Sequence, residues 1–203
     1  MNLDHSPVNW FDFLVVIMIL LGINKGRKHG MSEEMMISMQ WLAIIFAGAF
    51  LYKPLGEALS QSSPMSRLFC YIAMYLTLAA AIKVAFVLFK KAIGGKLIGS
   101  NVFGAAEYYL GMVAGVVRFL CILVFGMAVL NAPYYSSQAL AATKAYELDV
   151  YGSQFFPGVS SVQQQVFKES LVGSQFKQHV GFLLISPTAP EKKDVKRRKE
   201  DLP

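Results

Sequence analysis

Three charged residues stand inside apolar stretches of this sequence, where a charge is energetically costly and therefore informative. Asp12, Lys83 and Arg118 each have mainly apolar neighbours on both sides. If these stretches are membrane helices, such charges are functional candidates by default, because they must face protein or water. The alternative for Lys83 and Arg118 is that they form structural pairs or extend to the lipid headgroups, since each lies about two turns from the end of its stretch. Asp12 falls near the other membrane face and is not expected to pair with either.

Small residues form a second group of candidates. The glycines recur every four residues in two places, Gly22, Gly26 and Gly30 first, and Gly111 and Gly115 later. Glycine at this spacing lets membrane helices approach closely; the alternative is that glycine is simply frequent in membrane helices. Glu107 and Arg118 fall on the same helix face as the second pair of glycines. The spacing therefore predicts helix packing, with an acid and a base on the packing face.

The remaining reactive residue types form no catalytic constellation. Cys70 and Cys121 lie in different apolar stretches and are predicted to be free thiols that pack as small hydrophobes. The three histidines are far apart and none has a neighbouring cysteine or histidine, so we expect no metal or other cofactor. Gly94-Gly95-Lys96 lacks the first glycine and the final hydroxyl of a phosphate-binding loop. We therefore expect that the protein is not an enzyme.

Four apolar stretches must position these residues. They run over about residues 8–23, 35–52, 68–89 and 110–130. A bilayer core about 30 Å thick needs roughly 17–25 apolar residues as a helix, and continuous apolar runs favour helices over barrel strands. The chain is 55% hydrophobic and only 16% charged, with a mean hydropathy of +0.44. These features predict an all-α integral membrane protein with four transmembrane helices.

The distribution of charge predicts how these helices are oriented. A cleaved signal peptide is the alternative for the first stretch, but its charges have the wrong order, since Asp4 precedes it and basic residues follow it. Lysine and arginine are concentrated in the segments 24–34 and 90–109. Short segments of this kind stay in the cytoplasm. Both termini are therefore predicted to lie on the outer side of the membrane.

The parts outside the apolar stretches are less regular. The segment 90–109 has an apolar side interrupted by glycines and is expected to lie as a broken amphipathic piece at the membrane interface. Apolar residues at helical spacing predict a short amphipathic helix over 159–172. We expect a transmembrane domain over 1–130, a partly helical extramembrane tail over 131–185, and a charged, disordered end over 186–203.

Several short motifs, in their order and spacing around the four stretches, resemble a known family. They are Trp10-Phe11-Asp12-Phe13, the basic turn 25–30 followed by Glu33-Glu34, the stretch 110–118 that opens with Leu-Gly and ends at Arg118, and the segment 153–157. Over residues 8–157 this pattern is similar to the colicin V production protein family (CvpA). Glu107 stands where that family tends to have an aspartate, and Tyr108 replaces the basic residue that usually follows it.

The resemblance implies a protein of the bacterial inner membrane that takes part in toxin production or export. In that membrane the outer side, where the charge distribution places both termini, is the periplasm. The family has no agreed biochemical activity. Our first hypothesis is an accessory or structural protein for colicin V export and envelope upkeep that acts by binding partners. The second is a small oligomeric channel or transporter subunit, although no repeated halves typical of transporters are visible. We expect the lipid bilayer and membrane proteins or further copies as partners, with no nucleic acid and no small-molecule substrate identified.

Overall fold

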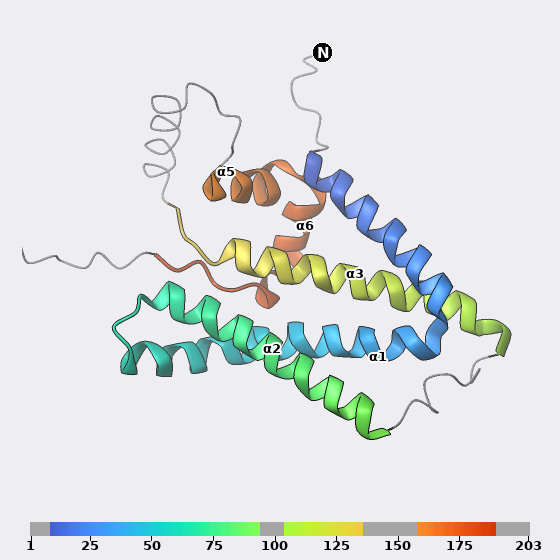
Figure 1. Ribbon diagram of the computed structural model, residues 1–203. Coiled ribbons are helices and arrows are strands. Elements are labelled where there is room, and N and C mark those ends of the chain that lie inside the picture. Colours follow the sequence, from blue (N-terminus) through green and yellow to red (C-terminus); the bar gives the residue numbers. More distant parts are fainter. Residues whose placement is uncertain (1–8, 94–103, 136–157, 190–203) are drawn as a thin grey trace, which may run out of the picture.

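The computed structural model describes residues 9–93, 104–135 and 158–189. Three helices within these residues are long and apolar enough to cross a membrane: α1 (Trp10–Ser62), α2 (Arg67–Ile93) and α3 (Glu107–Asn131) (Figure 1). A 3-10 turn, Gly104–Ala106, leads into α3. The described tail consists of α5 (Val159–Gln164), a π-helical turn (Gln165–Glu169), α6 (Leu171–Val180) and a 3-10 turn (Gly181–Leu183). The all-α expectation is therefore met in the described residues, whose only β pairing is an isolated bridge between Pro133 and Thr188.

The first two apolar stretches belong to one helix that bends sharply at Gly30. The backbone there has φ 73° and ψ 173°, a combination essentially restricted to glycine. The bend divides α1 into a first arm, 10–29, and a second arm, 31–62, which lie on either side of α3 (Figure 1). The first arm is about 30 Å long and the second longer, so each has the length of a membrane crossing. The predicted fourth crossing corresponds to this division of α1 and remains a prediction.

The ends of the helices differ from the sequence expectation in two places. The second arm continues past Tyr52 to Ser62 and includes Pro54. The extension packs on α2, where a Cβ on Gly56 would collide with the Tyr71 ring. Tyr52, at the start of the extension, meets the same ring edge to face. The expected interfacial segment 90–109 is helical at both ends, because α2 runs to Ile93 and α3 begins at Glu107; residues 94–103 lie outside the described part.

The two glycine series meet where the first arm crosses α3. A Cβ on Gly22 would lie 2.9 Å from the carbonyl oxygen of Gly115, and a Cβ on Gly111 would lie 2.5 Å from that of Gly26. Both obstacles are backbone atoms, which cannot rotate away as a side chain can. The two helices therefore approach as closely as glycine allows, in the manner expected of small residues in membrane helices.

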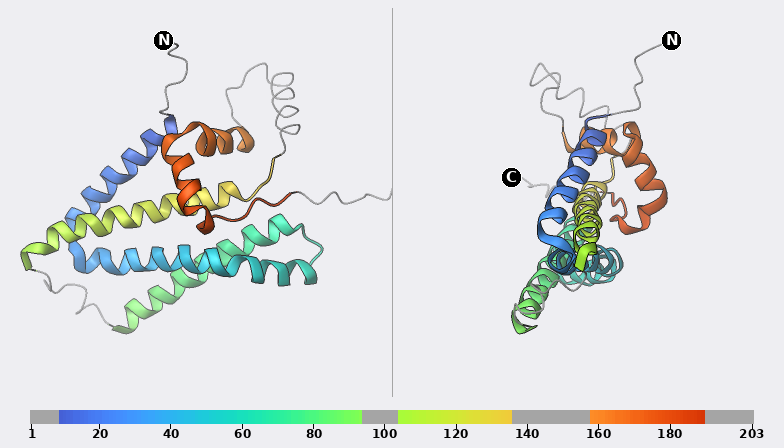
Figure 2. Two further views of the ribbon diagram at one scale, coloured as in Figure 1. Left: turned by 180° about the vertical axis from the view of Figure 1, so that it is seen from behind. Right: turned by 90° about the vertical axis from the view of Figure 1, so that its right-hand side faces the viewer.

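Aromatic rings fill the space between the second arm, α2 and α3. Tyr75 is fully buried and stacks on Phe125 with 5.3 Å between ring centroids, while Gly48 leaves the space that the Tyr75 ring occupies. Trp41 also contacts this group, edge to face with Phe125. Only the first half of α2 takes part in this packing, and its second half diverges from the other helices (Figures 1 and 2).

The described tail packs against the end of α3 and the start of α1 (Figure 2). Gln163 donates to the carbonyl oxygens of Leu130 and Pro133, at 3.0 and 2.9 Å, and so satisfies acceptors that the end of α3 leaves open. The helix predicted over 159–172 is interrupted at Ser170, which has extended backbone angles and forms the N-cap of α6. Of the end predicted to be disordered, residues 186–189 are described, and Ser186 bonds to the Tyr52 hydroxyl. Residues 190–203 lie outside the described part.

The glycine contact generates a test of the fold. Gly111→Leu should lower the amount of folded protein in the membrane and its unfolding temperature in detergent, because inserting a side chain into a packed contact costs about 1–3 kcal/mol or more. Gly126→Leu is the matched control in the same helix, since a Cβ on Gly126 meets nothing within 4 Å in the described structure. Leucine also favours helix over glycine, so the control should be neutral or slightly stabilising. Equal behaviour of the two variants would contradict the close helix contact.

Candidate functional site

A polar cluster lies immediately beyond the bend in α1. The side chain of Glu34 has 0% exposure, and one terminal nitrogen of Arg118 on α3 contacts both of its carboxylate oxygens at 3.0 and 3.2 Å. Nδ1 of His29, from the last turn of the first arm, lies 2.9 Å from the same carboxylate. The cluster therefore joins both arms of α1 to α3 through one buried acid.

The contact with Glu34 shows that Arg118 pairs within the protein and does not extend to the lipid headgroups. The Arg118 side chain retains 19% exposure and pairs with protein rather than extending freely to the membrane surface. A charge inside a membrane helix bundle is tolerated only when it is paired. Removing one partner leaves the other as an unpaired buried charge. Sequence reasoning missed Glu34 because it stood in a predicted turn. Helical spacing would have found it, since Ser38 one turn later faces α3 too and donates to the Ala114 carbonyl oxygen at 2.8 Å.

Glu107 acts at the bend itself. The change of direction at Gly30 leaves backbone amides of the second arm without intrahelical acceptors. Glu107 Oε1 accepts a hydrogen bond of 2.6 Å from the amide of Ser32, so this carboxylate caps the second arm from another helix. Beside it, the Arg27 guanidinium lies 5.1 Å from the centroid of the Tyr108 ring. Tyr108 thus provides an aromatic partner for a cation of the first arm.

Asp12 binds the tail rather than another membrane charge. Its carboxylate accepts from the Ser170 hydroxyl at 2.6 Å and from the amides of Leu171 and Val172 at 3.3 and 2.9 Å. It also accepts from the amide of Asn9 at 2.9 Å, which completes a capping box at the start of α1. One carboxylate therefore caps two helices at once, α1 and α6. A negative charge is favoured at both positions by the partial positive charge of a helix N-terminus.

The other candidates from the sequence lie apart from these contacts. Lys83 is exposed on the diverging half of α2. Cys70 and Cys121 are buried free thiols, on α2 and α3. In the described ranges, no group of three or more histidine, cysteine, aspartate or glutamate residues could hold a metal ion. The structure thus brings Glu107, Arg118 and the five glycines to one helix crossing and leaves Lys83 outside it.

The ion pair generates a stability test. Arg118→Ala should destabilise the protein by about 3–5 kcal/mol, because it leaves the buried carboxylate of Glu34 without its partner. Glu34→Ala should cost a similar amount for the converse reason. The double variant should cost clearly less than the sum of the two, as measured in a double-mutant cycle of unfolding in detergent. Lys83→Ala is the control for loss of one positive charge and should be neutral. Additive losses would show that the two residues do not stabilise one another.

Asp12 generates a second test, directed at the tail. Asp12→Ala should weaken tail docking, since loss of a helix cap costs about 0.5–2 kcal/mol. The measurement is the rate of limited proteolysis at Lys168 and Lys177, which should increase while the transmembrane core stays resistant. Glu33→Ala removes an exposed acid elsewhere on α1 and should leave the rate unchanged. An unchanged rate in Asp12→Ala would mean that other contacts hold the tail.

Comparison with known families gives one clear match. The family model described as "Colicin V production protein" matches residues 11–181. This range covers most of the chain and includes the crossing glycines, the Glu34–Arg118 pair and the Asp12 contact to the tail. No curated protein and no solved structure matches the chain.

Proposed function

This chain belongs to the colicin V production protein family, and on that premise we propose that it is a non-catalytic accessory protein of the bacterial inner membrane. Its apolar helices and its family make it a membrane protein with a role in colicin V production. In our proposal it is embedded in the lipid bilayer. It acts by binding other membrane proteins during toxin production or export and in envelope upkeep.

The observation that carries this proposal is the use of the charged residues inside the bundle. Glu34 and Arg118 bind each other, Glu107 caps the second arm, and Asp12 holds α6. Each of these contacts joins segments that are distant in the sequence. Charges engaged in this way support a structural role, because a catalytic group or an ion path needs polar atoms that can reach a substrate or a permeating ion.

The diverging half of α2 supplies a surface for a partner. It exposes large apolar side chains that neither the other helices nor the described tail covers: Val84, Val87, Leu88 and Phe89. Figures 1 and 2 show this half standing away from α1 and α3. In a membrane this surface contacts either lipid or another protein. We propose that it is a docking surface for a transmembrane helix of a partner protein.

The proposed orientation places both termini in the periplasm. Figure 1 shows the bend of α1, the end of α2 and the start of α3 at one side of the molecule. The basic residues of the bend and Lys90 and Lys91 of α2 gather on that side. Because short basic segments stay in the cytoplasm, this side is the proposed cytoplasmic face. The turn between α1 and α2 and the end of α3 then face the periplasm.

Partner binding can be tested by crosslinking in native membranes. A photoreactive residue at Val87, on the exposed face of α2, should give a defined adduct with another membrane protein. The same residue at the fully buried Tyr75 is the control and should give none. Adducts between copies of this chain alone would oppose the accessory role. If, in addition, reconstituted vesicles conducted ions and a folded Arg118→Ala variant altered that flux, the protein would instead be a channel subunit.

Orientation can be tested by cysteine labelling in a variant without the two native cysteines. A cysteine replacing Gln61, in the last turn of α1, should react with a membrane-impermeant maleimide in intact spheroplasts. One replacing Lys28, beside the bend, should react only after permeabilisation. Both positions are exposed in the structure, so a lack of reaction reports the membrane barrier and not burial in the protein. The reverse pattern would invert the proposed orientation.

A further inference from the structure

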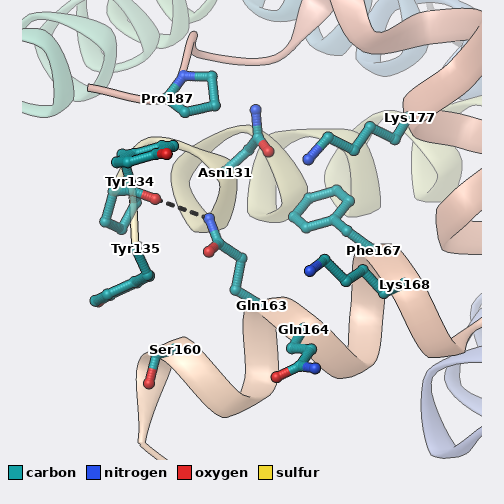
Figure 3. Close-up of a pocket in the computed structure, with 11 residues that line it drawn as sticks. Asn131, Tyr134, Tyr135, Ser160, Gln163, Gln164, Phe167, Lys168, Lys177 and Pro187 are labelled. Atoms are coloured by element: carbon teal, nitrogen blue, oxygen red, sulfur yellow. Dashed lines mark hydrogen bonds between the residues drawn. The ribbon is translucent and has the colours of Figure 1, made fainter. Parts of the chain in front are cut away.

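A cavity of about 410 Å³ lies between the end of α3 and the tail (Figure 3). Its wall includes Asn131 at the end of α3, Gln164 at the end of α5, Phe167 and Lys168 of the π-helical turn, and Lys177 of α6. A volume of this size is in the range of small-molecule sites. Gln163, which bonds to the Leu130 and Pro133 carbonyls, also lines this space, whereas the charged contacts of Asp12, Glu34, Glu107 and Arg118 lie outside it.

The cavity carries two positive charges at one point of its wall. Figure 3 shows the side chains of Lys168 and Lys177 extending on either side of the Phe167 ring, and Nζ of Lys177 lies 4.9 Å from the centroid of that ring. None of the described lining residues is acidic. Partial burial of its ammonium group, together with the charge of Lys168, lowers the pKa of Lys177. An anion bound between the two lysines would favour the charged form of Lys177. It would thereby oppose both the effect of burial and the repulsion from Lys168.

Asn131 contributes an acceptor that is buried at the same wall. The residue has 4% exposure, and its Nδ2 donates to the carbonyl oxygen of Ile185 at 2.9 Å. This bond fixes the orientation of the amide, because the flipped form would place two oxygens face to face. Oδ1 is left without a hydrogen-bond partner among the described residues. A buried acceptor in this condition is costly unless a ligand or water donates to it.

We propose that this cavity binds an anionic group, a phosphate ester or carboxylate, in a ligand that also carries a hydroxyl group. The anion lies between Lys168 and Lys177, and the hydroxyl donates to Oδ1 of Asn131. Two sources have this chemistry. The first is the headgroup of an anionic glycerolipid, because the cavity lies at the end of a membrane helix, at the depth of the lipid headgroups. The second is a soluble hydroxylated phosphate or carboxylate.

The experiment uses the purified full-length chain and two named probes. sn-Glycerol 3-phosphate is titrated onto the protein in neutral detergent, with inorganic phosphate in parallel. In a second arm, nanodiscs of phosphatidylglycerol are compared with nanodiscs of phosphatidylcholine by native mass spectrometry of retained lipid. The variants are Lys168→Gln alone and Lys168→Gln combined with Lys177→Gln. The matched control is Lys90→Gln combined with Lys91→Gln, which removes the same charge from the end of α2.

We expect binding of one probe that the cavity variants weaken roughly tenfold or more, as loss of a charge-assisted hydrogen bond predicts, and that the control leaves unchanged. Binding of glycerol phosphate in detergent identifies a soluble ligand, whereas selective retention of phosphatidylglycerol identifies a lipid. Tighter binding of glycerol phosphate than of inorganic phosphate supports the hydroxyl contact with Asn131. The proposal is overturned if neither probe binds the folded protein, or if the cavity variants and the control behave alike.

Discussion

The close contact between the first arm of α1 and α3 is the constraint on which the rest of the structure depends. In a bilayer, apolar surface gives helices little reason to associate, so packing and polar contacts decide their arrangement. The glycines at this crossing bring the two backbones together, with a Cβ on Gly22 only 2.9 Å from the carbonyl oxygen of Gly115. At that separation Glu107 reaches the Ser32 amide, and Arg118 reaches Glu34. A larger separation would break both polar contacts together.

Carboxylates then hold the ends of helices that the fold brings near them. Glu107 caps the second arm of α1 from α3, and Asp12 caps α6 from the first arm. In surroundings of low dielectric, an open backbone amide and an unpaired carboxylate are each costly, and one contact removes both costs. The acids of the bundle thus connect segments that are distant along the chain. This use of charge is compatible with a protein that holds its shape for a partner.

The geometry of the cavity depends on the contacts that anchor the tail to α1. Asp12 fixes the first turn of α6, and Lys177 lies further along the same helix. Trp10 adds a second tie between α1 and the tail, from its indole nitrogen to the Gln165 side chain at 2.7 Å. The position of the two lysines relative to Asn131 therefore follows from contacts made by the first turn of α1. A change at the start of the chain would alter the cavity near its other end.

The sequence by itself determined that the chain is a helical membrane protein, because long apolar runs leave the backbone no other way to satisfy its hydrogen bonds in lipid. Glycine spacing also identified both faces of the helix crossing, since that pattern is local. Only the tertiary structure decided that the first two stretches form one helix bent at Gly30, and that Arg118 pairs with Glu34, 84 residues away. It likewise decided that Asp12 binds Ser170, 158 residues away. Such pairs depend on distances across the folded chain, and periodicity within a single segment carries no information about them.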